Sequence, residues 1–149
     1  MNLQNRNVQT LQQTLAWLAE KYKLVAIYSF GSRAKEMWER VNDLSVEVEF
    51  PDSDLDIGVL PETNSRLDLD GKVNLALALE EAFNVSRVDL IVLPEARPFL
   101  ALDVVRGELL YVSNKDAESE YQLYVLRRAG DLAPLQQERM RMVLAGEAY

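Results

Sequence analysis

Segments of strand-like composition alternate along this chain with segments of helical periodicity, and this alternation restricts the fold more than any other feature. The helical segments carry apolar residues at steps of three and four, so each has one face to bury. The strand-like segments are short, apolar and bounded by turn-forming residues. We therefore expect an α+β (mixed α/β) fold, in which a mixed β-sheet is flanked by helices and followed by a C-terminal helical tail.

Turn and capping signals set the boundaries of the expected elements. The expected helices are 8–22, 32–38, 69–83, 98–106 and 116–144, and the expected strands are 24–30, 52–60, 87–93 and 109–112, with a weaker strand within 41–50. Ser32 is placed to cap the second helix, Asn84 to end the third, and Gly107 to follow the fourth. Gly130 and Pro134 are expected to break or kink the last helix.

Length and composition predict one domain over residues 1–149. The 149 residues, 48% of them hydrophobic, can fill one core without a disulfide or a metal. We expect this core over about 8–112 and the helical tail over about 116–146. The polar N-terminus and the lack of a membrane-length apolar run predict a cytoplasmic protein that binds no membrane.

The chain contains neither cysteine nor histidine, which removes many kinds of chemistry. Disulfides, thiolate zinc sites, Ser/His/Asp triads and Cys/His nucleophile pairs are excluded. The 24 acidic and 16 basic residues give a formal net charge of −8. This charge repels a phosphate backbone, so direct nucleic-acid binding is not expected, and a basic protein partner or a metal-masked anion is favoured.

The alternating segment Asp54-Leu55-Asp56 places two carboxylates on one face of an expected strand. The two side chains start about 6–7 Å apart and repel each other unless a cation lies between them. A solvated acidic strand face is the alternative interpretation. A calcium-binding EF-hand is excluded, because Ile57 and Thr63 stand where its glycine and bidentate glutamate are required.

A third acid, Asp89, lies in a later strand whose apolar composition predicts burial near the centre of the sheet. An unpaired carboxylate is costly to bury there, which favours a metal-binding or catalytic role together with Asp54 and Asp56. The alternative is an aspartate at a strand end, paired with Arg87.

The dipeptide Gly31-Ser32 closes one expected strand and opens a helix. Unpaired backbone N–H groups at such a junction bind anions such as phosphate, although a plain turn capped by Ser32 has the same sequence. It is not a P-loop, because no Gly-Lys-Ser/Thr follows. Arg33 is placed either to add a phosphate contact or to lie in solvent.

Three stretches, taken in order, form a recognisable set. They are 30–34 (Phe-Gly-Ser-Arg-Ala), 52–57 (Asp-Ser-Asp-Leu-Asp-Ile) and 87–91 (Arg-Val-Asp-Leu-Ile). The set resembles the DNA polymerase β-like nucleotidyltransferase superfamily, and specifically its minimal nucleotidyltransferase (MNT) proteins. The resemblance runs over most of the chain, including the helical tail from 121 to 144.

The resemblance implies a site for nucleotidyl transfer. Asp54, Asp56 and Asp89 would hold two Mg²⁺ ions, which suits an in-line displacement with pyrophosphate leaving. Gly31 and Ser32 would bind the β- and γ-phosphates of ATP, to which Arg33 would add a contact. An incoming hydroxyl would attack the α-phosphate, with Asp89 as the general base.

The spacing of the motifs departs from the family pattern in one place. Between Ser32 and Asp54 lie 21 residues, roughly twice the usual number, so 38–51 is interpreted as an insertion that forms a hairpin, a lid or a partner-binding surface. We expect a deletion within 41–50 to affect partner or substrate use more than folding.

Small MNT proteins that resemble this chain are commonly antitoxins of two-gene modules, whose toxin is a HEPN-family ribonuclease. The resemblance implies transfer of AMP from ATP to a tyrosine of the cognate toxin, and an acidic protein suits a basic partner. A non-catalytic antitoxin that binds and blocks its partner through exposed apolar residues of the helical tail is one alternative. An antibiotic nucleotidyltransferase, which usually carries an additional helical domain, is the other.

Overall fold

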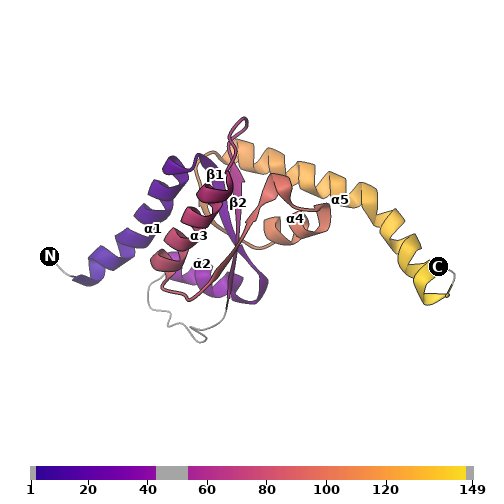
Figure 1. The fold of residues 1–149 in the computed structure, drawn as a ribbon, viewed down its shortest axis with the longest axis horizontal. Coiled ribbons are helices and arrows are strands. Elements are labelled where there is room, and N and C mark those ends of the chain that lie inside the picture. The colour runs from indigo at the N-terminus through magenta and orange to yellow at the C-terminus, as the bar shows by residue number, and fades with distance from the viewer. Residues whose placement is uncertain (1–2, 43–53, 147–149) are drawn as a thin grey trace.

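The computed structural model describes residues 3–42 and 54–146 (Figure 1). Its elements, in chain order, are α1 (Leu3–Lys21), β1 (Leu24–Phe30), the 3₁₀ turn η1 (Gly31–Arg33), α2 (Ala34–Asn42), β2 (Leu55–Pro61), α3 (Leu69–Phe83), β3 (Val88–Val92), the 3₁₀ turn η2 (Leu93–Glu95), α4 (Pro98–Val105), β4 (Glu108–Val112) and α5 (Lys115–Leu144). The alternation of strands and helices predicted from the sequence is confirmed.

The four strands of the described part form one sheet in the order β3-β2-β1-β4. β1 pairs antiparallel with β2 on one side and with β4 on the other, whereas β2 and β3 run parallel. The sheet is therefore mixed, as expected, and its central strands are β1 and β2. The parallel β2–β3 pair is joined through α3, which is the crossover that parallel neighbours require.

Helices cover both faces of this sheet (Figure 1). One core cluster joins α1, α2 and α3 to one face, and it contains Leu55, Ile57 and Val59 of β2. A second cluster joins α4 and α5 to the other face, where Tyr28 of β1 is buried. Leu55, Ile57 and Val59 are each fully buried, which contributes about 1.5–3 kcal/mol per side chain.

The ends of α3 follow the capping signals of the sequence. The Asp68 carboxylate accepts a hydrogen bond from the Gly71 backbone N–H at 2.7 Å, which satisfies one free donor of the first turn. Asn84 ends the helix in the left-handed conformation with φ 53°, as predicted.

Two local expectations, at Ser32 and at Gly107, had different outcomes: the first was wrong, and the second was confirmed. Ser32 does not cap a helix, because the chain first forms the turn η1, whose N-cap residue is Phe30. Gly107 follows α4 as predicted, but it is not in the left-handed conformation. A Cβ atom at Gly107 would instead collide with the Ser29 carbonyl oxygen, so β4 can lie beside β1 only if this residue is glycine.

The last helix is not broken. α5 continues from Lys115 to Leu144 with Pro134 inside it, and Figure 1 shows it bending where its colour passes from orange to yellow. The residue four positions before Pro134, where the proline ring meets the preceding turn, is Gly130. No side chain or neighbouring element lies within 4 Å of an ideal Cβ atom at Gly130, so nothing packed against this position opposes a bend.

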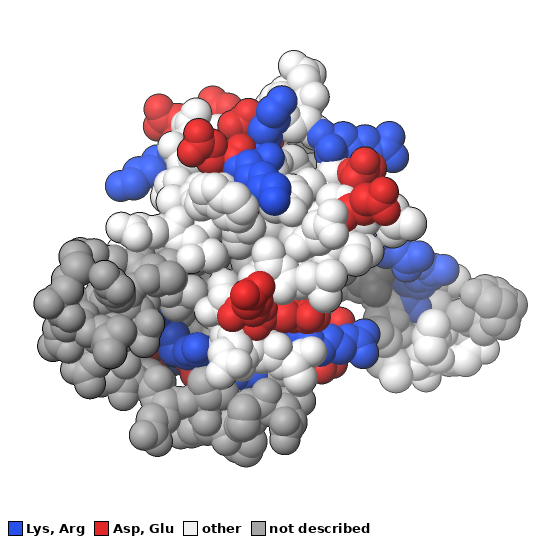
Figure 2. Space-filling view, turned by 60° about the vertical axis from the view of Figure 1, so that its left-hand side comes forward, with Lys and Arg blue, Asp and Glu red and all other residues white. Residues whose placement is uncertain are grey.

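The strand expected within 41–50 is not tested. Val41 and Asn42 are the last residues of α2, and 43–53 lie outside the described residues. No helix in the described part of the chain is long and apolar enough to span a membrane. On the face drawn in Figure 2, acidic and basic side chains are interspersed over the upper part of the molecule.

Candidate functional site

Two of the predicted acids lie at the beginning of β2. Asp54 directly precedes the strand and is exposed, while Asp56 is its second residue and is half-buried. Leu55 and Ile57 are fully buried on the opposite face. The prediction of one apolar face and one acidic face is confirmed, because successive side chains of a strand point to opposite sides.

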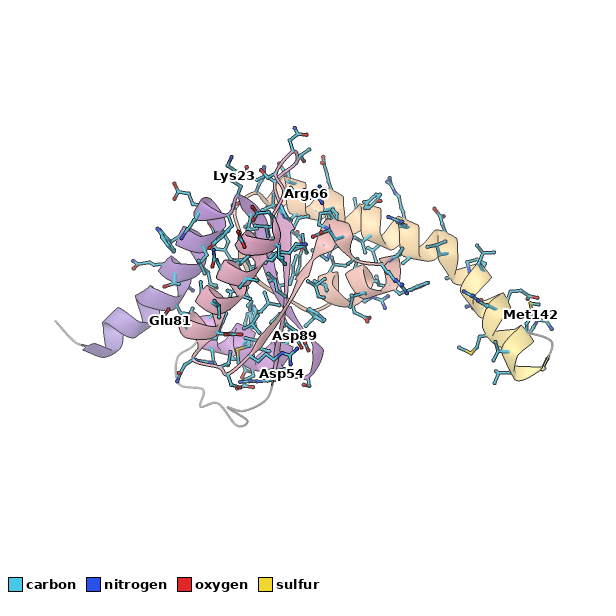
Figure 3. All side chains as sticks on the ribbon, viewed as in Figure 1. Lys23, Asp54, Arg66, Glu81, Asp89 and Met142 are labelled. Atoms are coloured by element: carbon cyan, nitrogen blue, oxygen red, sulfur yellow. The ribbon has the colours of Figure 1, made fainter. Side chains whose placement is uncertain are left out.

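The parallel pairing of β2 with β3 brings the third acid to the same place. Asp56 and Asp89 are register partners, so their side chains leave adjacent strands, about 4.8 Å apart, on the same face. Figure 3 shows Asp54 and Asp89 together at the lower end of the sheet. The three acids therefore lie at the same end of the sheet, where β2 and β3 begin.

The electrostatics of Asp56 reflect this gathering. Burial raises the pKa of Asp56 above its ordinary value of 3.8, and the negative charges of Asp89 and Asp54 raise it further. A cation bound next to Asp56 would reverse the effect of the two neighbouring charges. The surroundings of Asp56 thus favour the protonated carboxyl more than water does, and a nearby positive charge would oppose this.

The apolar neighbours of Asp89 predicted a position at the centre of the sheet, and this prediction is wrong. Among the strands that the structure describes, β3 lies at an edge of the sheet, and the Asp89 side chain is 41% exposed. Its Oδ1 atom forms an ion pair with Arg87 Nε at 3.2 Å, which is the alternative that the sequence left open. Ion pairs this exposed contribute only about 0–1 kcal/mol, so Asp89 can exchange this partner at little cost.

Gly31 closes the site from the end of β1. It has φ +76°, and a Cβ atom built on it would lie 2.6 Å from Asp56 Oδ2. The reason is the register, because the preceding residue, Phe30, is the partner of Asp56 across the antiparallel pair. Both the backbone conformation and the space available select glycine at this position.

The residues after Gly31 differ in their surroundings. Ser32 is exposed, whereas Arg33 is only 4% exposed. Of the two alternatives that the sequence left open for Arg33, the one in which it lies in solvent is wrong. Arg33 Nε pairs with Glu36 Oε2 at 3.3 Å. Glu36 was missed by the sequence analysis, although its i,i+3 spacing from Arg33 on a helix was the available signal. Ser29 Oγ supports the same turn by donating to the Ala34 carbonyl oxygen at 2.9 Å.

A hard divalent cation fits the donors of this site in kind. Carboxylate oxygens are the ligands that Mg²⁺ prefers, and Asp56 is electrostatically disfavoured as an anion by its neighbours. Among the described residues, however, no three acidic side chains converge closely enough to hold a metal ion. The ion pair between Asp89 and Arg87 occupies one of the oxygens that such a site would use.

The sequence matches the family model described as polymerase beta, nucleotidyltransferase over residues 12–116. No curated protein gives a match. The fold is similar to that of a chain in a toxin–antitoxin structure with AMP-PNP, with 24% identity and a TM-score of 0.67 over 89% of this chain and 98% of that one.

Two further solved structures show the same likeness. A chain of the MntA–HepT toxin–antitoxin structure is 23% identical, with a TM-score of 0.64 over 91% of this chain and 98% of that one. A chain from the tri-AMPylated HEPN toxin of Shewanella oneidensis in complex with MNT antitoxin is 23% identical, with a TM-score of 0.65 over 92% and 98%.

Proposed function

The chain belongs to the polymerase β nucleotidyltransferase family, and we propose that it is the cytoplasmic antitoxin of a two-protein module. In this proposal it transfers AMP from ATP to a tyrosine hydroxyl of a HEPN-family toxin. The observation that carries the proposal is the meeting of Gly31, Asp56 and Asp89 at one end of the sheet.

The chain's own residues would divide the work as follows. Gly31 and Ser32, at the β1–α2 junction, bind the β- and γ-phosphates of ATP through backbone N–H groups, and Arg33 adds positive charge beside them. Asp54, Asp56 and Asp89 would hold two Mg²⁺ ions. When bound, these ions neutralise charge that develops on the transferred phosphoryl group and the leaving pyrophosphate.

In the proposed transfer, one bond to the α-phosphorus forms as another breaks. The tyrosine oxygen forms a bond to the α-phosphorus of ATP, and the bond from that phosphorus to the bridging oxygen of the β-phosphate breaks. Pyrophosphate leaves, and Asp89 accepts the tyrosine proton as general base. Asp89 reaches this role by giving up its exposed ion pair with Arg87.

Charge and structural likeness support the assignment of the partner. The net charge of −8 favours association with a basic protein such as an RNA-cutting enzyme. The similar chains come from structures of toxin–antitoxin complexes, one of which contains an AMPylated HEPN toxin.

A second candidate is an antitoxin that only binds its toxin. The ion pair of Asp89 with Arg87, and the lack of three converging acidic side chains among the described residues, favour it. Such a protein would block its partner without transferring AMP.

One experiment separates the two candidates. The protein is incubated with ATP, Mg²⁺ and the product of the adjacent gene, and the intact masses of both proteins are measured. The proposal predicts an AMP adduct on the partner, which disappears with Asp54→Asn or Asp56→Asn. A tight complex without any adduct, unchanged by both substitutions, would establish the binding-only antitoxin instead.

A further inference from the structure

Within the described part of the chain, no other element buries a side chain of the C-terminal half of α5. Val125 and Ala129 are the last α5 side chains buried in the core. From 130 to 144, none of the side chains that the structure describes is buried. Figure 1 shows this half extending away from the sheet, and Figure 3 places Met142 near its far end.

This helix exposes an unusual share of the apolar surface. Eight of the fifteen large apolar side chains that are exposed in the described part of the chain belong to α5: Leu123, Tyr124, Leu126, Leu135, Met140, Met142, Val143 and Leu144. Exposed apolar residues scattered singly are ordinary, but a concentration on one element indicates an interaction surface.

Three of these side chains share one face of the helix. Tyr124, Leu135 and Met142 are separated by eleven and seven residues, which correspond to about three turns and two turns. We call these three residues the tail stripe. Their exposed fractions are 51%, 68% and 36%.

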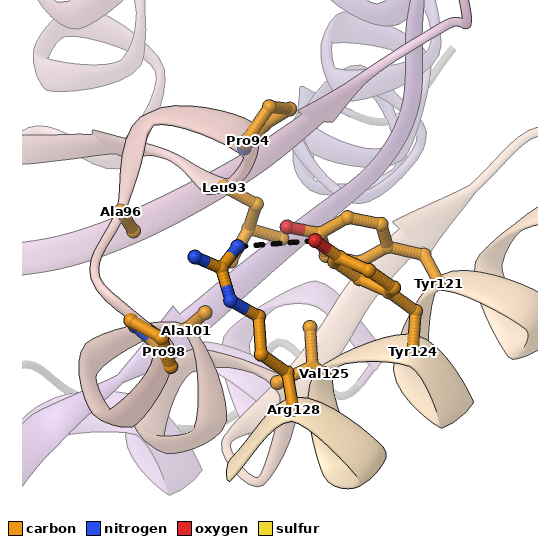
Figure 4. Close-up of a pocket in the computed structure, with 9 residues that line it drawn as sticks. All are labelled: Leu93, Pro94, Ala96, Pro98, Ala101, Tyr121, Tyr124, Val125 and Arg128. Carbon is orange, nitrogen blue, oxygen red and sulfur yellow. Dashed lines mark hydrogen bonds between the residues drawn. The ribbon is translucent and has the colours of Figure 1, made fainter. Parts of the chain in front are cut away.

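The tail stripe begins at a pocket between α5 and the η2–α4 segment (Figure 4). The pocket has a volume of about 130 Å³, and its lining includes Leu93, Pro98, Tyr121 and Tyr124. Arg128 Nη1 donates a hydrogen bond to the Tyr124 hydroxyl at 3.0 Å, which holds both side chains at the rim. The pocket is large enough for one apolar side chain of a partner.

The energetics of an isolated helix also require a partner. Helical stretches of fewer than about 12–15 residues are marginal in water unless they pack against another surface. The unpacked half of α5 also contains Pro134, which removes one backbone hydrogen bond. Packing of the tail stripe against another protein would supply the missing stabilisation.

The distribution of charge indicates that the protein packed against α5 is not a second copy of this chain. α5 carries five basic and five acidic side chains, so the net charge of −8 lies entirely on the rest of the chain. Two copies joined along α5 would bring two such bodies together, whereas a basic partner is attracted by them.

Almost all of α5 lies outside the residues that match the family model. The family match ends at residue 116, where α5 has only begun. The similar chains from toxin–antitoxin structures cover 89% and 92% of this chain. Since α5 comprises 30 of the 149 residues, these matches include part of it. At least part of α5 thus belongs to the fold shared with chains from such complexes.

We propose that the tail stripe and its adjoining pocket form the docking surface for the HEPN-family toxin. This inference rests on the proposed function for the identity of the partner. The toxin contributes an apolar surface flanked by basic side chains. One apolar side chain of this surface enters the pocket.

The test compares two double variants of the full chain. Leu135→Glu with Met142→Glu places charge on the tail stripe, whereas Val73→Glu with Leu77→Glu places it on α3, where the side chains are 50% and 56% exposed. Binding to the product of the adjacent gene is measured by calorimetry without ATP. We expect the tail-stripe variant to bind about tenfold or more weakly, and the α3 variant to bind like the wild type.

The outcomes separate this inference from the proposed function. Weakened binding confined to the tail-stripe variant supports the docking surface, even where the wild type transfers no AMP and the catalytic proposal fails. Unchanged binding overturns the docking surface, even where AMP transfer is observed. Light scattering tests whether a second copy of this chain occupies the surface instead. If the wild type is a dimer, the tail-stripe variant is a monomer and toxin binding is unchanged, the inference is overturned in favour of a second copy.

Discussion

Gly31 lies directly against the carboxylate of Asp56, so that a Cβ atom on Gly31 would stand 2.6 Å from Asp56 Oδ2. The contact joins the end of β1 to the acidic face of β2. It brings the turn proposed to bind phosphate next to the acid proposed to bind metal.

The first prediction is that Gly31→Ala destabilises the protein. The residue has φ +76°, which costs a side chain about 1–3 kcal/mol, and the new methyl group must also displace the Asp56 carboxylate. Urea unfolding measures the change in free energy. Gly130→Ala is the matched control, since no contact lies within 4 Å of its ideal Cβ and alanine favours helix by roughly 0.5–1 kcal/mol. Equal stability of Gly31→Ala and the wild type would contradict the geometry.

The second prediction concerns the ion pair between Arg87 and Asp89. Replacing Arg87 by Gln removes an exposed pair, so the free energy of unfolding should change by no more than about 1 kcal/mol. The same change frees an Asp89 oxygen, so Mg²⁺ should bind more tightly in a titration followed by calorimetry. Weaker Mg²⁺ binding in Arg87→Gln would show that the ion pair positions Asp89 instead of competing for it.

The third prediction follows from the raised pKa of Asp56. Because burial and the charges of Asp89 and Asp54 make the pKa higher in the folded chain than in the unfolded one, the folded state binds the proton more tightly. The stability gained from protonation is fully present below about 3.8, and it is lost as the pH rises through the folded pKa. Asp56→Asn carries no charge at any pH, so it should be more stable than the wild type at pH 7 without Mg²⁺.

This advantage should shrink as the pH falls toward 3.8, and urea unfolding at a series of pH values follows it. Asp103→Asn is the control, because Asp103 is an exposed acid on α4, remote in sequence from the acidic face. If Asp56→Asn were less stable than the wild type at pH 7, the electrostatic account of the site would be wrong.

Local sequence patterns predicted the parts of the site that depend on one strand. The alternation around Asp54 and Asp56 determines which side chains share a face, and this requires no knowledge of neighbouring strands. The predicted position of Asp89 was wrong because the position depends on the order of the strands. An apolar segment can form an edge strand as well as a central strand of a sheet. The burial of Arg33 was likewise missed, since it depends on how η1 packs after β1.

The fold shows the same division between local and non-local information. Strand 24–30 and helix 69–83 were predicted with the boundaries that the structure has, because turn and capping residues mark their ends. The need for glycine at 107 comes from Ser29, which is distant in the sequence. Near Gly130 and Pro134 the sequence predicted either a break or a kink of the last helix, and the structure has the bend in a continuous α5 (Figure 1).

The last prediction concerns the attachment of α5 to the sheet. The Tyr28 hydroxyl donates a hydrogen bond to Glu118 Oε1 at 2.5 Å, and both side chains are buried between β1 and α5. Burial, together with the Glu118 carboxylate, raises the pKa of Tyr28, so the tyrosine remains a donor throughout the neutral range. Tyr28→Phe would leave a buried carboxylate without this donor, at a cost of about 1–3 kcal/mol in the free energy of unfolding.

Tyr124→Phe is the matched control, since its hydroxyl is bonded to Arg128 on the exposed surface and its loss should change stability by less than about 0.5 kcal/mol. The double variant Tyr28→Phe with Glu118→Gln should recover part of the loss, because the unpaired charge is removed together with its donor. Urea unfolding compares the four proteins. If Tyr28→Phe and Tyr124→Phe were equally stable, the buried hydrogen bond would not be what anchors α5 to β1.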